Sequence, residues 1–290
     1  MEQIEDTIIY QLLIDLNIPC KEPPYTHLQN NNHSVTDNKT FFIKTNTEPK
    51  GLQIELETLP HLTYAPKPLH LNLLKIHNHY ILITEHIQSK PIQLQQLTEN
   101  NIAIIIHQLK QINSMPQNVY SDPRTLEGTL NLINSRMSNP SLTKTQRKQL
   151  DKLIQKFITP YIIKYENTQT LAHTDMHLKN ILYTTNNQIL IIDYEGIKPS
   201  PPEADLASLY QSLQQNNQQT IYSKFEKEFI KQYPNFNQEA LHDSVLFKNT
   251  LTTTACIKLA PHMLDERIEK LTQSSQTNKL PEQLPQLISA

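Results

Sequence analysis

The stretch from residue 171 to residue 196 constrains the fold of this chain more than any other part of it. It reads Leu-Ala-His-Thr-Asp-Met-His-Leu-Lys-Asn-Ile-Leu-Tyr-Thr-Thr-Asn-Asn-Gln-Ile-Leu-Ile-Ile-Asp-Tyr-Glu-Gly. Residues 181–184 and 188–192 have the composition of two short strands, and the turn between them contains asparagine, which tolerates positive φ. A hairpin of this length returns the chain close to its start, so we expect Asp193 to lie beside Asn180.

Three polar residues of this stretch match the chemical needs of phosphoryl transfer. The reaction uses a carboxylate that orients an attacking hydroxyl and accepts its proton, and oxygen ligands that hold Mg²⁺ against nucleotide phosphates. Asp175 suits the first role, and Asn180 and Asp193 suit the second. A histidine two residues before an aspartate occurs by chance in many proteins. An aspartate at a strand end is often only part of a turn or a helix cap. The order and spacing of all the pieces together favour the functional interpretation.

These residues also carry a resemblance to a known group of enzymes. Residues 171–182 resemble the catalytic loop of the aminoglycoside phosphotransferase and choline kinase superfamily, which are small-molecule kinases with a protein-kinase-like fold. The Ile-Asp-Tyr-Glu sequence at 192–195, followed by Pro-Glu-Ala-Asp-Leu-Ala at 202–207, resembles the second acidic segment of that superfamily. Protein kinases would instead have Asp-Phe-Gly and Ala-Pro-Glu. Neither of those motifs is present.

The resemblance implies an α+β fold with two lobes. Residues 1–86 would form a nucleotide-binding lobe with an antiparallel sheet and one helix, and residues 87–290 a mainly helical lobe with the catalytic loop and the acceptor pocket. The implied activity is transfer of the γ-phosphate of ATP to a hydroxyl of a small molecule. The implied acceptors are a choline- or ethanolamine-like amino alcohol, or an aminoglycoside or amino sugar.

The resemblance also implies a role for individual residues of the loop. Asp175 would be the catalytic base, Asn180 and Asp193 the Mg²⁺ ligands, and His173 a brace for the loop. Asp205 would tie the loop to the following helix, and its residue type also suits the N-cap of that helix. We interpret His177 as a structural histidine.

The loop departs from the superfamily at two positions. Thr174 and Lys179 stand where the superfamily usually has glycine. Lys179 either reaches a phosphate or is simply solvated, and the solvated interpretation is favoured because a lone lysine is usually on the surface.

The candidate nucleotide-covering hairpin spans residues 25–45 and has no glycine at its turn. Kinases normally place glycines there, so that backbone amides can approach the phosphates. Asn31 and Asn32 are the best substitutes, since asparagine enters the left-handed region more readily than other non-glycine residues. They also resemble an asparagine-containing pair that the superfamily often has here. An asparagine-rich loop on its own would indicate only a turn.

Lys44 follows the apolar strand residues 41–43, as the phosphate-binding lysine of a kinase small lobe does. Its carboxylate partner is expected from the next helix, which offers Glu55 and Glu57. We prefer Glu55, because its spacing to two following leucines resembles the helix of the superfamily. Pro60 predicts a kink or an early end of that helix.

A second hairpin, formed by residues 71–76 and 80–85, is expected to lead into the hinge at residues 83–87. There the adenine edge would be read by backbone groups near Glu85 and Ile87. Beyond residue 91 the pattern is mainly helical. It predicts helices over 101–113 and 146–159, the second interrupted at Pro160, and further amphipathic helices over 220–271.

Composition excludes several other classes of protein. The 290 residues carry a net charge of −2 and no basic stripe, which argues against nucleic acid as a partner. The two cysteines match no metal or redox pattern and favour a reducing compartment. The acidic amino terminus and the lack of a run of roughly 18 apolar residues argue against a secretory signal and membrane insertion, so a cytoplasmic location is expected.

A second enzyme activity stays open as an alternative, namely phosphorylation of a protein or nucleotidyl transfer, which this fold can host. The leading alternative is a nucleotide-binding pseudokinase that acts as an interaction module. The glycine-free turn favours it, and the presence of Lys44, Asp175, Asn180 and Asp193 argues against it. No sequence pattern identifies the acceptor, a preference for ATP over GTP, or an oligomeric state. Candidate polar groups for the acceptor pocket, all acids, are Glu195, Glu239, Asp243, Asp265 and Glu266.

Overall fold

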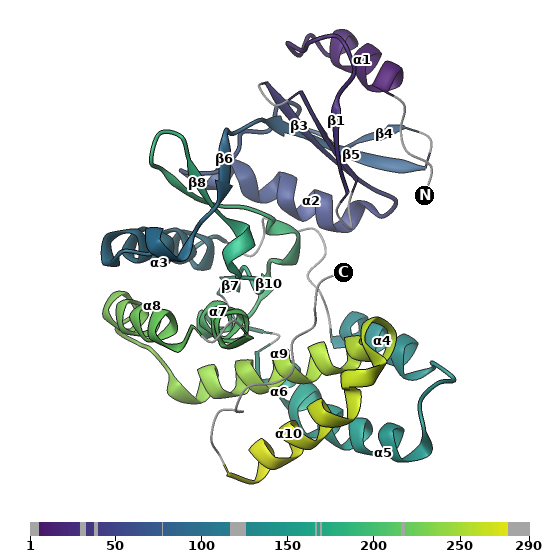
Figure 1. Ribbon diagram of the computed structural model, residues 1–290, viewed down its shortest axis with the longest axis vertical. Helices are drawn as coiled ribbons and strands as arrows, with labels where there is room; N and C mark the ends of the chain where they lie inside the picture. The colour runs from purple at the N-terminus through teal and green to yellow at the C-terminus, as the bar shows by residue number, and fades with distance from the viewer. Residues whose placement is uncertain are drawn as a thin grey trace. The chain divides into compact units, whose positions relative to one another are not determined.

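The computed structural model describes residues 6–29, 33–37, 40–76, 78–116, 126–165, 167–168, 170–215 and 218–277 (Figure 1). These form two compact units, Met1–Gln93 with Lys179–Gly196 and Leu94–Leu178 with Ile197–Ala290. As predicted, antiparallel sheets are combined with helices. These two compact units divide the chain differently from the predicted lobes 1–86 and 87–290. The two lobes stay a prediction.

The first unit is built on a five-stranded antiparallel sheet with the strand order β1-β2-β3-β5-β4. The described strands of this unit are β1 (Thr26–Gln29), β2 (His33–Thr36), β3 (Phe41–Asn46), β4 (Leu74–Ile76), β5 (His79–Glu85), β6 (Ser89–Pro91), β8 (Ile181–Thr184) and β9 (Ile189–Ile191). Its described helices are α1 (Asp6–Asp15) and α2 (Pro49–Thr58), with the short turns η1 (Leu59–His61) and η6 (Tyr194–Gly196).

The side chains of β3 alternate between the two faces of this sheet, as the period of a strand requires. Phe41 and Ile43 belong to a buried cluster with Ile9 and Leu13 of α1. On the other face, Leu82 of β5 packs with leucines of α2, so the two helices cover opposite faces (Figure 1). Lys44 is paired directly with Leu82 in the β3–β5 register and therefore lies on the α2 face.

The hairpin predicted after the catalytic loop is confirmed. Strands β8 and β9 pair antiparallel, and β6 adds a third strand beside β8. Asn187 adopts φ 59° in the connecting turn, the left-handed conformation for which asparagine is suited. The hairpin returns Ile192 to Asn180, and the Ile192 N–H donates to the Asn180 carbonyl at 3.0 Å.

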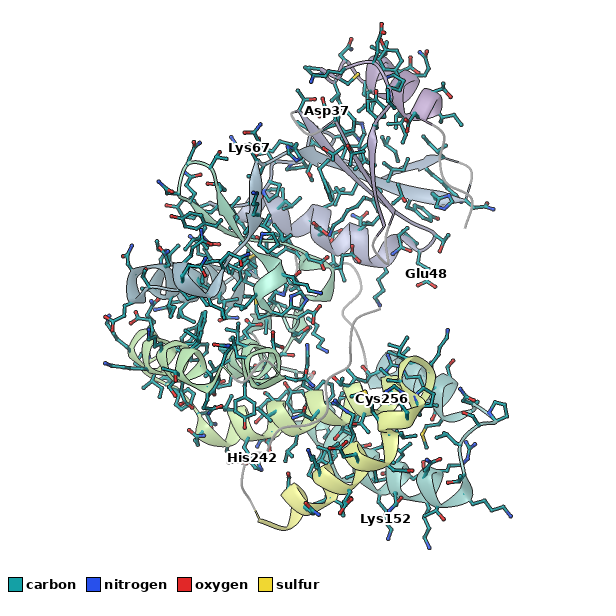
Figure 2. All side chains as sticks on the ribbon, viewed as in Figure 1. Asp37, Glu48, Lys67, Lys152, His242 and Cys256 are labelled. Atoms are coloured by element: carbon teal, nitrogen blue, oxygen red, sulfur yellow. The ribbon has the colours of Figure 1, made fainter. Side chains whose placement is uncertain are left out.

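The second unit is mainly helical. Its described elements are η2 (Leu94–Gln96), α3 (Glu99–Asn113), α4 (Leu126–Met137), α5 (Lys144–Leu153), η4 (Ile154–Ile158), α6 (Thr159–Tyr165), β7 (Leu171–Ala172), β10 (Lys198–Pro199), α7 (Glu203–Gln215), α8 (Gln219–Gln232), α9 (Gln238–Leu259), η7 (Pro261–Met263) and α10 (Leu264–Thr277). The short η5 (Leu178–Asn180) lies where the chain passes from this unit to the first. A buried apolar cluster joins α4, α5, α6, α9 and α10 and includes Cys256, which Figure 2 labels.

Two details differ from the sequence-based expectation, and one expected feature falls on residues that are not described. The predicted return strand of the first hairpin is two strands, β2 and β3, which are separated by a turn at Asp37 whose carboxylate accepts from the Thr40 N–H at 2.8 Å. Asn31 and Asn32 lie outside the described residues. Pro160 does not end its helix, because the π-helical turn η4 precedes it and shifts the hydrogen-bond pattern before the residue that lacks an N–H.

No helix in the described part of the chain is long and apolar enough to cross a membrane.

Candidate active site

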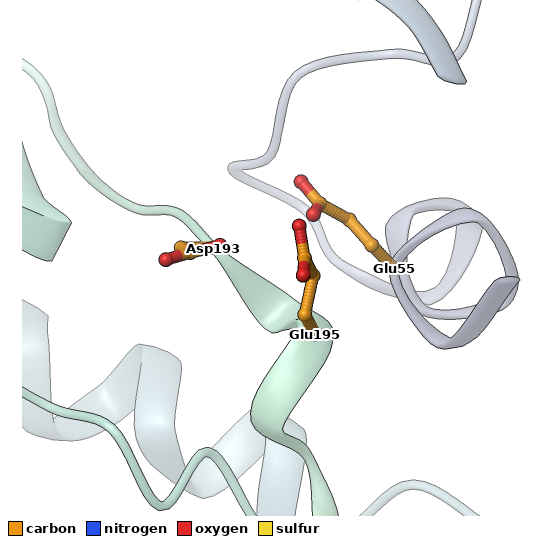
Figure 3. A group of neighbouring side chains, drawn as sticks. All are labelled: Glu55, Asp193 and Glu195. Carbon is orange, nitrogen blue, oxygen red and sulfur yellow. The ribbon is translucent and has the colours of Figure 1, made fainter. Parts of the chain in front are cut away.

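Lys44 is the centre of a charged cluster in the first unit. Its ammonium lies 2.6 Å from a carboxylate oxygen of Glu55, 2.8 Å from one of Asp193 and 3.4 Å from one of Glu195. The Lys44 side chain is 14% exposed, so these contacts form in a largely dehydrated place. Figure 3 shows the three carboxylate side chains close together, with Glu55 projecting from α2.

Helix α2 explains why Glu55, and not Glu57, meets the lysine. Pro49 lies at the start of the helix, where its fixed φ favours the first turn. Leu52 and Leu56 are buried against Leu82 of the sheet, and Glu55, three residues after Leu52, lies beside that leucine on the helix surface and is itself buried. Glu57 lies elsewhere on the helix and accepts from the Gln53 side chain at 2.7 Å. The helix ends before Pro60, as expected, and continues only as the short turn η1.

The residues that follow β9 bring the other two acids to Lys44. Asp193 adopts φ 68°, a left-handed conformation that turns the chain sharply at the strand end. The next residue, Tyr194, is buried and donates its hydroxyl to the Ile191 carbonyl, which anchors the turn η6. Glu195 then reaches α2 so closely that a Cβ on Gly51 would lie 2.8 Å from its carboxylate oxygen. The absence of a side chain at Gly51 is therefore what admits Glu195.

The charges of this cluster do not balance. Burial would lower the pKa of Lys44, but the three carboxylates outweigh it and raise that pKa well above its ordinary value. Burial raises the pKa of Glu55 to about 7, against the opposing effect of Lys44. One ammonium thus faces three carboxylates, and the excess negative charge is partly relieved by holding a proton on Glu55 near neutral pH.

The same carboxylates have the composition of a cation site. Glu55, Asp193 and Glu195 each offer one oxygen within 4.8 Å of the others. Oxygen ligands of this kind suit Mg²⁺. Asn180, the other predicted ligand, is buried at the start of β8 and is joined to the end of β9 by its backbone carbonyl. Asp193 and Asn180 therefore lie at the same end of the β8–β9 hairpin.

Asp175 belongs to the second unit and has different neighbours. Its carboxylate accepts from the ammonium of Lys248 on α9 at 3.1 Å, and His177 lies 3.8 Å away. Partial burial would raise the pKa of Asp175, but Lys248 and His177 outweigh it and hold the pKa below its ordinary value. The Asp175 side chain is 51% exposed, so an approaching hydroxyl group could reach it.

The loop before Asp175 is held by several hydrogen bonds. Thr174 adopts φ 62°, which is costly for a β-branched residue and which glycine would adopt without that cost. Its N–H donates to Asp205 at 2.8 Å, and its carbonyl accepts from the Ser208 hydroxyl at 2.9 Å and from Lys248 at 2.6 Å. These three partners oppose the strain at Thr174.

Asp205 ties the catalytic loop to α7 but is not its N-cap, because α7 begins two residues earlier at Glu203. The Asp205 carboxylate is fully buried, and burial raises its pKa against the opposing effect of His173. The Asn113 amide donates to Asp205 at 3.3 Å and to the Leu171 carbonyl at 2.6 Å, and Tyr233 donates its hydroxyl to Asn113. Asp205 thus acts through the backbone of the loop.

The predicted hinge residues lie at and after the end of β5. The Glu85 N–H donates to the Lys67 carbonyl at 2.9 Å, and the Glu85 carboxylate accepts from the N–H of Lys67, which Figure 2 labels. The Ile87 carbonyl accepts from the Ser89 hydroxyl at 3.1 Å. A carbonyl oxygen has two lone pairs, so this bond still leaves Ile87 an acceptor for a ligand N–H.

Two residues of these clusters were not assigned to them from the sequence. Glu195 was grouped with candidate acceptor residues, although its place two residues after Asp193 was a usable signal. Lys248 gave none, since it lies 73 residues from Asp175 on a helix whose periodicity does not mark it.

Comparison with known proteins places the chain in a family. Residues 78–284, more than half of the chain, match the family described as choline/ethanolamine kinase. A comparison with curated protein sequences finds no significant match.

Several solved structures share the fold. The choline kinase LicA from Streptococcus pneumoniae has a TM-score of 0.66 at 14% identity, covering 94% of this chain and 99% of that one. Amicoumacin kinase hAmiN, solved with AMP-PNP, Ca²⁺ and Ami, has a TM-score of 0.70 at 12% identity, covering 98% and 96%. Wild-type aminoglycoside 2'-phosphotransferase-IIIa, solved with GDP, has a TM-score of 0.64 at 16% identity, covering 94% and 98%. At these identities the likeness shows the fold, which is the protein-kinase-like fold that the sequence predicts. Together with the family match, it means that the chain belongs to the choline/ethanolamine kinase family of small-molecule kinases.

Proposed function

We propose that the protein transfers the γ-phosphate of ATP to the hydroxyl of a small amino alcohol and needs Mg²⁺ to do so. The observation that carries this proposal is the contact of Lys44 with Glu55, Asp193 and Glu195 at 2.6–3.4 Å. A lysine held by a helix glutamate, beside the aspartate that follows a hairpin, is the arrangement with which kinases bind nucleotide phosphates and metal. The family match supports the choice of an amino alcohol as acceptor.

In this proposal the first unit binds the nucleotide. Lys44, oriented by Glu55, contacts phosphate oxygens, while Asp193 and Asn180 hold Mg²⁺, with Glu195 as a further carboxylate. The metal neutralises the charge that develops on the phosphates. The excess of carboxylates around Lys44 supports this assignment, because a divalent cation would balance charges that the protein alone leaves unbalanced. Asn31 and Asn32 are proposed to cover the phosphates, and backbone groups near Glu85 and Ile87 to contact the base.

Asp175 is proposed to act on the acceptor. Its half-exposed carboxylate accepts a hydrogen bond from the acceptor hydroxyl, orients the oxygen toward phosphorus and takes the proton as the bond forms. A carboxylate with a low pKa is a weak base, which suits this reaction, since the attacking hydroxyl loses its proton late when the transition state is loose.

The acceptor is proposed to be choline, ethanolamine or a related amino alcohol. The printed family description is the support for this choice, and LicA, a choline kinase, has the same fold. An aminoglycoside or amino sugar is the second acceptor class, supported only by neighbours of similar fold. Both classes offer a hydroxyl close to a cationic nitrogen.

The test is phosphoryl transfer by the purified protein with Mg²⁺-ATP and, in parallel, choline, ethanolamine and kanamycin. Acceptor-dependent ADP formation and a phosphorylated product of the expected mass are expected with choline or ethanolamine. If only kanamycin were phosphorylated, the protein would be a small-molecule kinase as proposed, but its acceptor would be an aminoglycoside and not an amino alcohol. Binding of Mg²⁺-ATP without transfer to any acceptor would favour the pseudokinase, an interaction module that binds nucleotide.

A further inference from the structure

Lys248 connects helix α9 to the catalytic loop by two contacts. Its ammonium lies 2.6 Å from the carbonyl oxygen of Thr174 and 3.1 Å from a carboxylate oxygen of Asp175. The Lys248 side chain is only 22% exposed, whereas that of Asp175 is 51% exposed. The lysine therefore holds the inner side of a carboxylate whose other side is open to solvent.

The two contacts act on adjacent residues that need support. Thr174 has a left-handed backbone, and such strain persists only where the surroundings determine it. The Asp205 carboxylate and the Ser208 hydroxyl hold the peptide groups of Thr174 from α7. Lys248 contacts both the Thr174 carbonyl and the Asp175 carboxylate. It thereby couples the strained peptide to the carboxylate.

We propose that Lys248 is a positioning residue of the phosphotransfer reaction, whose ammonium fixes the Asp175 carboxylate and the Thr174 carbonyl in one arrangement. This inference rests on the role of Asp175 in the proposed function. Lys248 touches neither the nucleotide nor the reacting oxygen in this account. It acts by restricting the rotamer of the residue that orients the acceptor hydroxyl.

A comparison within the same unit separates this contact from an ordinary surface ion pair. Lys164 also has two oxygen partners, Glu239 at 2.6 Å and Asp243 at 2.8 Å. The side chain of Lys164 is 43% exposed, and those of Glu239 and Asp243 are 73% and 29% exposed. Exposed pairs of this kind contribute little to stability. The Lys248 side chain is less exposed than that of Lys164. One of its partners is the Thr174 backbone carbonyl, which has less freedom to move than a side chain.

The contact with Lys248 makes Asp175 a weaker base, which indicates that the role of Lys248 is to orient Asp175. An ammonium beside a carboxylate lowers the basicity of that carboxylate, which would be a disadvantage if Asp175 had to be a strong base. In a loose transition state the base orients the hydroxyl first and accepts its proton late. Misplacement of a reacting group by about 1 Å can lower a rate by roughly 100-fold, so precise orientation outweighs the lost basicity.

The test compares four variants by two measurements. The pKa of the Asp175 carboxyl is followed by ¹³C NMR of aspartate-labelled protein, assigned with Asp175→Asn, and kcat is measured with the acceptor that wild type uses. The charged groups that face Asp175 are Lys248 from α9 and His177 and His173 from its own loop, so the titration is read against both histidines. Melting temperatures confirm that each variant is folded.

Lys248→Met is expected to raise the pKa of Asp175 toward its ordinary value, to move the acidic limb of kcat/KM to higher pH and to lower kcat by about 10- to 100-fold. Lys248→Arg should restore part of both quantities, because it keeps the charge. Ser208→Ala removes another donor to Thr174 without touching Asp175, so the Asp175 pKa should stay and kcat should fall less. Lys231→Met, which removes the exposed ion pair of Lys231 with Glu228, should change neither.

An unchanged Asp175 pKa in Lys248→Met, or equal losses of kcat in Lys248→Met and Ser208→Ala, would overturn the proposal. The NMR measurement needs no acceptor. If wild type transfers no phosphate although Lys248→Met shifts the pKa, the proposed function fails while the contact stands, and Lys248 loses its role in catalysis.

Discussion

The two charged clusters of this protein are built in opposite ways. Around Lys44 one ammonium faces three carboxylates, and burial raises the pKa of Glu55 to about 7. Around Asp175 one carboxylate has an ammonium and a histidine beside it, and its pKa is held low. The first cluster is short of positive charge and the second is not. This difference supports the proposed function, in which the first cluster binds Mg²⁺ and Asp175 in the second orients the acceptor hydroxyl.

The largest effect is expected at Asp175. Asp175→Asn keeps the shape of the side chain but removes its ability to take a proton, so kcat should fall by about 100- to 10,000-fold. Affinity for Mg²⁺-ATP, measured by titration calorimetry, should stay within about twofold, because the nucleotide is assigned to the other cluster. Near-normal turnover in this variant would remove Asp175 from the mechanism. If this variant also bound Mg²⁺-ATP much more weakly, the separation of nucleotide binding at Lys44 from hydroxyl orientation at Asp175 would be wrong.

Asp193→Ala tests the proposed Mg²⁺ site in the cluster around Lys44. Removal of this carboxylate should weaken Mg²⁺-dependent ATP binding on the order of 100-fold, because it takes away both a metal ligand and a partner of Lys44. The measurement is the rise in melting temperature with ATP, with and without Mg²⁺, since a ligand that binds only the folded state stabilises it. Asp151→Ala, an exposed acid on α5, is the matched control. A full Mg²⁺-dependent shift in Asp193→Ala would contradict the assignment.

The sequence identified much of both clusters, since their parts are encoded locally. Runs of apolar residues indicated β3 and β5, and the order of strand, lysine, helix and glutamate predicted the contact of Lys44 with Glu55. The fixed distance between Asn180 and Asp193, with a turn rich in asparagine, predicted the β8–β9 hairpin. The departure from glycine at Thr174 was noted from the sequence, but the left-handed backbone of this residue was not predicted.

What the sequence could not supply depends on tertiary packing. Lys248 meets Asp175 only because α9 packs against α7, and no local pattern encodes that contact. Glu195 reaches Lys44 because Gly51 leaves room on α2, a relation between two distant residues. The expectation that the helix is interrupted at Pro160 was wrong. A π-helical turn at residues 154–158 precedes Pro160 and shifts the hydrogen bonds there, so the helix continues past the residue that has no N–H.

Glu55→Gln is expected to change how stability depends on pH. The pKa of Glu55 rises from 4.5 to about 7 on folding, so the folded state binds this proton more tightly than the unfolded state does. The resulting stabilisation is complete below about pH 4.5 and is lost as the pH rises through about 7, amounting to roughly 3 kcal/mol at most. Nucleotide-free Glu55→Gln should therefore lose less stability than wild type between pH 5 and pH 8. Urea unfolding measures this, with Glu57→Gln on the same helix as control. Equal pH dependence in both variants would show that Glu55 ionises normally.

Gly51→Ala should disturb the same cluster from the side of α2. Alanine normally stabilises a helix relative to glycine by about 1 kcal/mol, but here its Cβ would meet Glu195 at 2.8–3.3 Å. We expect this gain to be cancelled and Mg²⁺-ATP affinity to fall about 10-fold, because Glu195 must move. Gly128→Ala on α4 is the matched control and should show the ordinary gain in urea unfolding. If both variants gain equally and bind nucleotide normally, Glu195 has no essential place beside Lys44.

The smallest effect is expected at Thr174, on the side of the orienting carboxylate. Thr174→Gly removes the cost of a left-handed β-branched residue, about 1–2 kcal/mol, and adds chain entropy to the unfolded state, about 0.5–1 kcal/mol. The free energy of unfolding should therefore rise by up to about 1.5 kcal/mol. Asn187→Gly is the matched comparison, since Asn187 has nearly the same φ but already tolerates it and would lose its hydrogen bond from Tyr183. It should gain nothing. The N–H and carbonyl of residue 174 keep their partners in Thr174→Gly, so kcat should stay within a few-fold of wild type. A large fall in kcat without loss of stability would mean that the threonine side chain itself helps to hold Asp175, and that its departure from glycine is part of the mechanism.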